Sequence, residues 1–308
     1  MIIDVRCFLL VEEGELFPDW IIDYGVALSG SPREKVKERM EERKLDASGD
    51  LLVEDMDIVG IDKALLTCPD HGLVRGTGDN MSLDEYYKLY HKAVERHPSR
   101  LYMIGGVDPR RPDAARFIEK AVKEYGIVGV SLANQQGFFP NERYCYPVYS
   151  KCQELGIPVC IYGAPEIPPL VSKSCRPILV DEIASDFPDL TIILNKAISA
   201  WWEEAAGISR HKPNVYLDTA NSQIVAMAEP RWEFYRQLRL LLSIGGSKKV
   251  MFASAWPIYR WLRPVNHSNF VELIKSPPPE VQAMGIEFRE EEMADYLGGN
   301  AARVFKLK

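Results

Sequence analysis

Short apolar runs recur along the whole chain. They are rich in Ile, Val and Leu without strict alternation, which is typical of strands buried on both faces. They predict eight strands, at residues 2–8, 63–67, 101–107, 126–132, 157–161, 190–195, 214–218 and 249–253. Helices are predicted between them, at residues 82–97, 112–125, 145–155, 178–187, 201–211 and 232–242. The first of these helices opens with Ser82 and Glu85, at the spacing of a capping box.

Eight alternations of strand and helix, without a break in composition, indicate a closed (β/α)8 TIM barrel that spans all 308 residues as a single domain. Two segments depart from the minimal barrel. Residues 10–50 follow the first strand and contain Phe17, Trp20 and Tyr24, so they form either a lid over the barrel mouth or a packed surface insertion. Residues 276–300 combine a proline run with an acidic helix and predict a C-terminal appendage on the outside of the barrel.

Composition and charge narrow the class of protein. A hydrophobic content of 46% with 26% charged residues is ordinary for a globular domain. The net charge of −7 argues against binding to nucleic acid, and no apolar run is long enough to span a bilayer. The chain runs directly into a strand, without the pattern of a signal peptide. The six cysteines lack any CxxC or framework spacing, so we expect reduced, mostly buried thiols in a cytoplasmic protein.

Lys196 is the unusual residue of this pattern. It closes the apolar run that begins at Leu190, where a buried strand is predicted to end. Desolvation disfavours an ammonium group, so a lysine in this position is expected to have a lowered pKa and a nucleophilic amine. Two other interpretations stay open: the side chain extends out to solvent, or it pairs with a carboxylate that the sequence does not identify.

A set of segments taken together resembles the amidohydrolase-related family, the type 2 metal-dependent hydrolases and decarboxylases. The resemblance spans nearly the whole chain, and it implies a TIM barrel with a metal site at the carboxyl ends of the strands. The segments are 3–5, 137–141, 146–159, 186–190, 201–204, 214–219 and 299–305.

The metal ligands that the resemblance implies are missing from this chain. The family carries a His-x-His pair on strand 1, histidines at the ends of strands 4, 5 and 6, and an aspartate after strand 8. The corresponding positions hold Arg6, Phe8, Ala133, Tyr162, Lys196 and Ala255. Zinc or manganese sites of this kind need imidazole and carboxylate ligands. We therefore expect no catalytic metal and no other cofactor.

The remaining replacements predict the lining of the site. Tyr162 is a candidate acid or base, or fills the space of a lost histidine, and a structural role is favoured for Arg6. Ser131, Asn134, Asn195 and Ser199 are candidate hydrogen-bonding groups. The candidate apolar walls, suited to an uncharged aromatic ligand, are Phe8, Ala133, Phe138, Ile198, Ala255 and Trp256.

The leading hypothesis from the sequence is an engineered retro-aldolase. In it, Lys196 attacks the ketone of a β-hydroxyketone, forms a Schiff base and cleaves the carbon–carbon bond with help from Tyr162. The alternatives are a hydrolase or decarboxylase with an altered metal site, and a non-catalytic binding protein in which Lys196 anchors an anion. The partners expected are a small carbonyl substrate and, at most, a second copy of the chain.

Overall fold

Eight parallel strands form the centre of the computed structural model, in the order β1 to β8 along the sheet. The predicted (β/α)8 TIM barrel is thereby confirmed. The structure describes residues 1–9, 11, 22–23, 25–27, 30–41, 46–70, 81–166, 170–222, 225–226, 232–257 and 267–307. The strands are β1 (Ile3–Cys7), β2 (Lys63–Cys68), β3 (Leu101–Gly106), β4 (Gly129–Leu132), β5 (Val159–Tyr162), β6 (Ile192–Asn195), β7 (Val215–Asp218) and β8 (Val250–Met251).

The barrel is nearly closed between its first and last strands. Strand β8 is short, so the seam is made by the residues that follow it. Val5 N donates to Phe252 O at 3.1 Å, and Ala255 N donates to Arg6 O at 2.9 Å. This seam fixes the carboxyl end of β1 beside the segment after β8.

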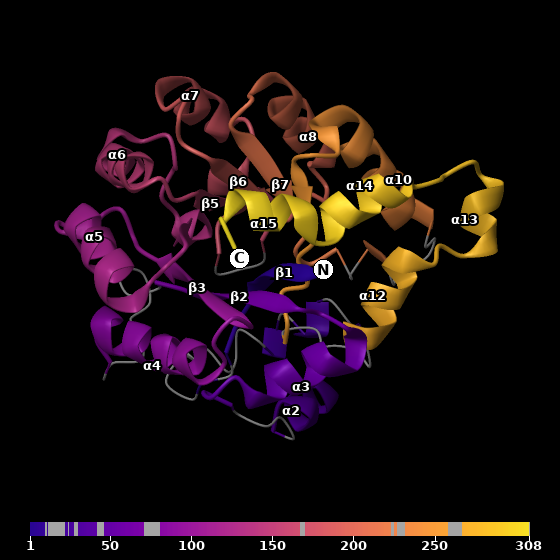
Figure 1. The fold of residues 1–308 in the computed structure, drawn as a ribbon, viewed down its shortest axis with the longest axis horizontal. Coiled ribbons are helices and arrows are strands. Elements are labelled where there is room, and N and C mark those ends of the chain that lie inside the picture. Colours follow the sequence, from indigo (N-terminus) through magenta and orange to yellow (C-terminus); the bar gives the residue numbers. More distant parts are fainter. Residues whose placement is uncertain are drawn as a thin grey trace.

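Helices surround the strands as a ring, as Figure 1 shows for α4 to α8. The capping box predicted at the start of α4 is present, since Ser82 N donates to Glu85 Oε2 at 2.8 Å and Glu85 N to Ser82 Oγ at 3.3 Å. The helices are α2 (Arg33–Glu41), α3 (Asp50–Val59), α4 (Leu83–Arg96), α5 (Ala114–Tyr125), α6 (Tyr146–Leu155), α7 (Leu179–Asp186), α8 (Trp202–His211), α10 (Trp232–Leu240), α12 (His267–Lys275), α13 (Pro279–Ala283), α14 (Glu290–Ala294) and α15 (Asn300–Val304).

Two apolar clusters hold the barrel together. The inner one fills the barrel and includes Ile3, Leu65, Ile104 and Ile193. The outer one lies between strands and helices and takes the alternate strand positions, such as Leu66. Burial of both faces explains why the strand sequences are continuously apolar. The six cysteines are all buried and unpaired, as expected.

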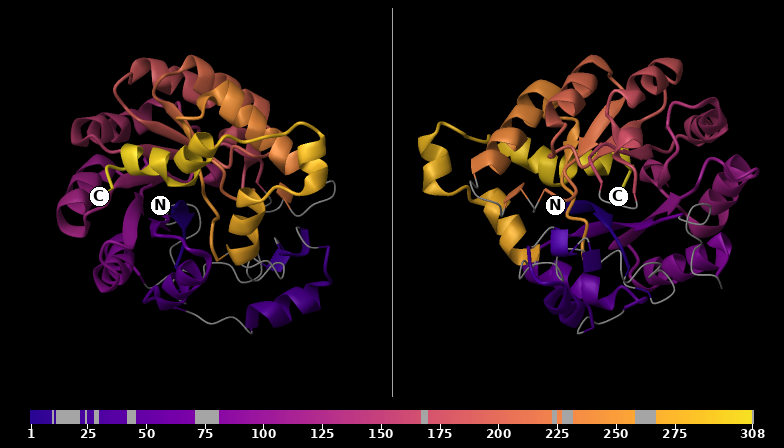
Figure 2. Two further views of the ribbon diagram at one scale, coloured as in Figure 1. Left: turned by 45° about the vertical axis from the view of Figure 1, so that its right-hand side comes forward. Right: turned by 180° about the vertical axis from the view of Figure 1, so that it is seen from behind.

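The C-terminal segment closes one end of the barrel. The π-helix η6 (Asp295–Gly299) and α15 cross the strands in Figure 1, and the view from behind in Figure 2 places them beyond the strands. Phe305 joins the inner cluster, and Phe252 N donates to Tyr296 O at 2.9 Å. The amino ends of the strands meet this segment, so the opposite, carboxyl ends are left for the mouth.

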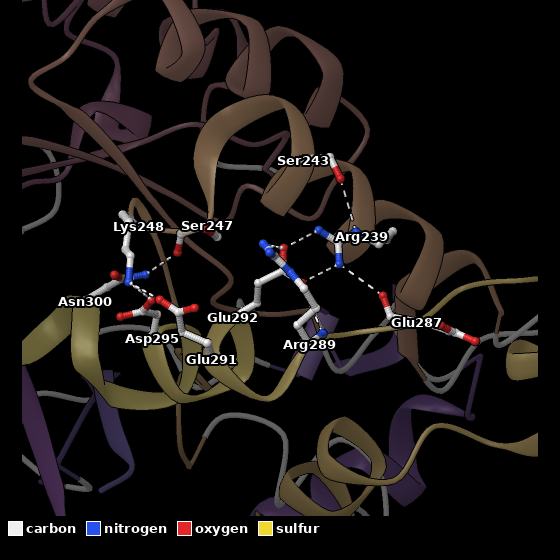
Figure 3. Close-up of polar contacts among 10 residues, drawn as sticks. All are labelled: Arg239, Ser243, Ser247, Lys248, Glu287, Arg289, Glu291, Glu292, Asp295 and Asn300. Carbon is white, nitrogen blue, oxygen red and sulfur yellow. Dashed lines mark hydrogen bonds and ion pairs between the residues drawn. The ribbon is translucent and has the colours of Figure 1, made fainter.

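Charged side chains fasten α14 and η6 to α10 and to Lys248, which follows the π-helix η5 (Leu241–Gly246) (Figure 3). Arg239 donates from two nitrogens to the Glu292 carboxylate, both at 2.8 Å. Arg289 donates to the same carboxylate at 3.0 Å, and Lys248 pairs with Glu291 and Asp295. The acidic helix within the predicted C-terminal appendage is therefore tied to α10 by these contacts.

Two further predictions concern the lid over the barrel mouth and the absence of a membrane-spanning segment. Phe17, Trp20 and Tyr24, the aromatics of the lid prediction, lie outside the described residues. No helix in the described part of the chain has the length and apolar character needed to cross a membrane.

Candidate functional site

Polar side chains gather where four strands of the barrel end. Arg6 comes from β1, Tyr162 from β5, Asn195 and the next residue Lys196 from β6, and Asp218 from β7. We call these five residues the mouth cluster. In TIM barrels, catalytic groups come from the carboxyl ends of several strands, so this cluster is the candidate site.

Arg6 lies at the centre of the mouth cluster. It is only 2% exposed, and its Nη1 donates to Asn195 Oδ1 at 2.9 Å. Its guanidinium carbon is 4.4 Å from the centroid of the Tyr162 ring. Burial opposes the charged form, but the neighbouring Tyr162 and Asp218 outweigh it and raise the pKa of Arg6 above its ordinary value. Arg6 is therefore a fixed positive charge inside the barrel.

Asp218 balances part of that charge through Asn195. The Asn195 amide nitrogen donates to Asp218 Oδ2, while Asp218 Oδ1 accepts from Lys196 N at 2.9 Å and Ala220 N at 3.0 Å. Burial raises the pKa of Asp218, and the Arg6 guanidinium opposes that rise. The aspartate thus holds the ends of β6 and β7 in register and positions the amide that contacts Arg6.

Lys196 forms an ion pair with Glu166, in the loop after β5. The two side chains are 12% and 5% exposed. Glu166 is held by its backbone, which donates to Ser172 Oγ at 3.0 Å and accepts from the same oxygen at 2.9 Å. An opposite charge in contact favours the ammonium form of a lysine. The sequence favoured a neutral amine at Lys196. The structure instead supports the alternative in which Lys196 pairs with a carboxylate.

Two strand ends adopt a backbone conformation that non-glycine residues rarely use. Lys196 has φ = +61° and Ala255 has φ = +58°. Each such residue costs about 1–3 kcal/mol, and these outliers cluster at functional sites. Both are positions at which the resemblance implied a metal ligand.

The thiols beside the cluster are unreactive. Burial raises the pKa of Cys160, which lies under Arg6, to about 12. Burial likewise raises the pKa of Cys175, beside the Lys196–Glu166 pair, to about 12. Both stay protonated near neutral pH, so neither supplies a thiolate nucleophile.

Asn134 contacts backbone atoms of the neighbouring strand. Its Nδ2 donates to Tyr162 O at 3.0 Å and to Ser174 O at 2.7 Å, and its Oδ1 accepts from Tyr162 N at 2.9 Å. Ser199 Oγ accepts from Trp201 N at 3.4 Å, at the turn into α8. These two residues shape the backbone around Tyr162 and Lys196.

The residues predicted as apolar walls divide between the two clusters. Phe8 and Ala255 join the inner cluster at the seam of the barrel. Phe138, Ile198 and Trp256 join the outer cluster, and Trp256 Nε1 donates to Asp55 Oδ2 at 2.8 Å. Ala133 is buried at the end of β4. Phe8 and Ala255 are thus the two that share the barrel interior with the mouth cluster.

The donor set of the mouth does not fit the divalent metal that the resemblance implies. The mouth cluster has one carboxylate, Asp218, which accepts from three donors, and the adjacent Glu166 carboxylate is paired with Lys196. The central group is the Arg6 cation. Within the described residues, no three His, Cys, Asp or Glu side chains are arranged to hold a metal ion. A buried guanidinium also repels a second cation.

Two residues of the site escaped the sequence reasoning. Asp218 ends a predicted strand, which was a usable signal because barrel strand ends carry functional groups. Glu166 lies in a loop and contacts Lys196 across 30 positions of sequence. No pattern along the chain indicated that contact.

Comparisons with known proteins agree with the fold. A family model described as Amidohydrolase matches residues 70–307. No curated protein sequence matches the chain. Among solved structures, a TIM-barrel protein of Bordetella bronchiseptica is similar at a TM-score of 0.71 and 19% identity, with 99% of this chain and 98% of that chain covered.

Two decarboxylase structures are also similar. For 5-carboxyvanillate decarboxylase from Sphingomonas paucimobilis, the TM-score is 0.67 at 18% identity, covering 100% of this chain and 99% of that one. For a dihydroxybenzoic acid decarboxylase from a Polaromonas species, with bound manganese, the TM-score is 0.66 at 18% identity, covering 99% and 97%. At such identities these likenesses establish the fold.

The prediction of a Schiff-base aldolase is wrong. Similar structures with a stated activity include decarboxylases and a hydratase. The physical reason lies at Lys196, whose amine is engaged with the Glu166 carboxylate. Nothing in the fold or the comparisons indicates an engineered site.

Proposed function

This chain belongs to the amidohydrolase family, and from that premise we propose that it is a decarboxylase-type lyase acting on a small aromatic carboxylic acid. The observation that carries the proposal is the mouth cluster, a set of shielded polar groups, four of them ionisable, at the carboxyl ends of β1, β5, β6 and β7. The decarboxylases of the same fold support the reaction class. Hydrolysis by the same site is the related reaction within the family.

Tyr162 is the proposed proton donor. Decarboxylation places a proton on the ring carbon that bears the carboxylate. The carbon–carbon bond then breaks, its electron pair returns to the ring, and CO2 leaves. The phenol oxygen of Tyr162 gives the proton and becomes a phenolate, which the Arg6 guanidinium stabilises and solvent reprotonates. The 4.4 Å separation of the guanidinium from the Tyr162 ring suits that role.

The test is release of CO2 from 5-carboxyvanillate and 2,6-dihydroxybenzoate. We expect Tyr162→Phe to lower kcat by about 10²–10⁴, the usual contribution of a positioned acid. Tyr144→Phe is the matched control, because Tyr144 is 41% exposed and outside the mouth cluster. Full activity of Tyr162→Phe would exclude Tyr162 as the acid, and absence of CO2 release from any aromatic acid would exclude the reaction.

Metal content is measured separately on the purified protein. Since the donor set does not fit a metal, we expect substoichiometric zinc and manganese and the same rate before and after treatment with a chelator. A stoichiometric metal whose removal abolishes activity would instead favour the hydrolase or decarboxylase with an altered metal site.

One observation favours a second candidate, a non-catalytic binding protein. The carboxylate and the amine of the mouth cluster are already engaged, since Asp218 accepts three hydrogen bonds and Lys196 pairs with Glu166. Binding of an aromatic acid in calorimetry, without conversion over hours, would support this candidate over the lyase.

A further inference from the structure

Arg6 uses only part of its guanidinium. Nη1 donates to Asn195, but Nη2 is buried and finds no hydrogen-bond partner in the part of the chain that the structure describes. A buried polar group without a partner costs about 1–3 kcal/mol, and more when it carries charge. Such a group in a native structure needs a specific explanation.

Comparison with two other arginines of this chain shows that the unpaired nitrogen of Arg6 is unusual. Arg111 donates twice to Asp70, at 2.6 and 2.8 Å, and Arg239 donates twice to Glu292. Both are more exposed than Arg6, with side chains 24% and 22% exposed. Arg6 is the most buried of the three and forms no ion pair within the described residues.

The position of Asn195 explains why Asp218 does not form an ion pair with Arg6. The Asn195 amide lies between them, accepting from Arg6 Nη1 and donating to Asp218 Oδ2. Asn195 and two backbone N–H donors hold the Asp218 carboxylate away from direct contact with Arg6. One edge of the guanidinium is therefore kept from the protein's own carboxylate.

The rings of Tyr162 and Phe8 flank the same group. Their centroids lie 4.4 and 5.5 Å from the guanidinium carbon, so the planar cation is held by aromatic contacts while Nη2 stays unpaired. A guanidinium held in one orientation suits a carboxylate, whose two oxygens match its planar fork. An uncharged ligand would leave Nη2 without a charged partner.

We propose that the carboxylate of the ligand is the missing partner, bound at Arg6 Nη2, and that this internal cation occupies the role that the resemblance gave to a metal ion. The ligand class, a small aromatic carboxylate, rests on the proposed function. Binding of a carboxylate at Arg6, the anchor, can be tested separately from catalysis, because an acid bound there need not react. Arg6 is on this account the residue that selects for charge, in contrast to the uncharged ligand expected from the sequence.

Calorimetry with benzoate and with benzamide, its uncharged counterpart of the same shape, tests the anchor. The native protein is expected to prefer benzoate by at least about tenfold, equivalent to about 1.4 kcal/mol. Arg6→Gln should abolish that preference while leaving benzamide binding within about threefold. Arg6→Lys keeps the charge without the planar fork, so it should retain part of the preference.

Arg116→Gln is the control, because the Arg116 side chain is 83% exposed and belongs to helix α5, outside the mouth cluster. If Arg6→Gln fails to fold, as judged by circular dichroism, Arg6→Lys carries the test. Equal binding of benzoate and benzamide by the native protein, no benzoate binding at all, or an unchanged preference in a folded Arg6 variant would each overturn the proposal. Benzoate binding that depends on Arg6, without CO2 release from any aromatic acid, would keep the anchor and remove the lyase function.

Discussion

At the scale of single residues, the mouth of the barrel is governed by which charges contact one another. Lys196 and Glu166 are both largely shielded from water, so each depends on the other for compensation. Truncating one partner of a buried pair leaves an uncompensated charge, which is more costly than the pair itself is stabilising. Arg6 shows the complementary case, a buried charge whose contacts leave one donor for a ligand.

We expect Lys196→Met to lower the free energy of unfolding by about 3–5 kcal/mol, because Glu166 remains buried without its cation. The double variant Lys196→Met with Glu166→Gln should recover much of the loss. Urea denaturation measures both. Lys123→Met is the control, since Lys123 pairs with Glu119 at the surface with 68% of its side chain exposed, and it should cost below about 1 kcal/mol. A loss at Lys196 no larger than at Lys123 would contradict the argument.

At the scale of elements, the C-terminal segment reaches the barrel through a close backbone approach. Gly298, in the π-helix η6, lies so near the start of β1 that a Cβ there would stand 2.4 Å from Met1 O. A backbone oxygen cannot move aside as a side chain can. The glycine therefore allows η6 to lie directly under the first strand.

Gly298→Ala is expected to destabilise the protein by about 1–3 kcal/mol, the usual cost of overpacking. Gly207→Ala, in the middle of α8, is the matched control because its new Cβ would have no atom within 4 Å. That substitution should instead stabilise by about 0.5–1 kcal/mol through helix propensity. The pair is compared by urea denaturation, and equal effects at the two positions would refute the close-approach argument.

At the scale of the whole molecule, charge holds the last helices to the barrel. Glu292, only 6% exposed, is the hub of this network (Figure 3). Hydrogen bonds from Arg239, and then from Arg289, lower the pKa of Glu292 below its ordinary value of 4.5. The stabilisation is therefore complete above about pH 4.5 and is lost as the pH falls through the lower pKa of the folded state.

Glu292→Gln should reduce the free energy of unfolding at pH 7 by about 1.5–3 kcal/mol, the range for hydrogen bonds to charged groups. The difference from the native protein should narrow steadily as the pH is lowered below 4.5, the ordinary value for this carboxyl. Urea midpoints at several pH values give both curves. Glu291→Gln, at a side chain 77% exposed, is the control and should cost below about 1 kcal/mol at pH 7. A constant gap between native and Glu292→Gln curves would show that the charge is not responsible.

The sequence by itself determined the barrel, because each strand and helix is encoded in a few neighbouring residues. Apolar runs predicted all eight strands, and the capping box at Ser82 is in place. The strand ends then indicated where a site should lie, with Arg6, Tyr162, Asn195 and Lys196 among its members. The expected loss of the family's metal ligands rests on residue identity alone and stays a prediction.

Only the tertiary structure decided what these residues do together. Arg6 meets Asn195 across 189 positions, and Lys196 meets Glu166 across 30. The charge state of a side chain depends on such neighbours, which the register and closure of the barrel bring within reach. A lysine at the end of an apolar strand is a nucleophile when unpaired and an ion-pair member when a carboxylate reaches it, and no local pattern separates the two.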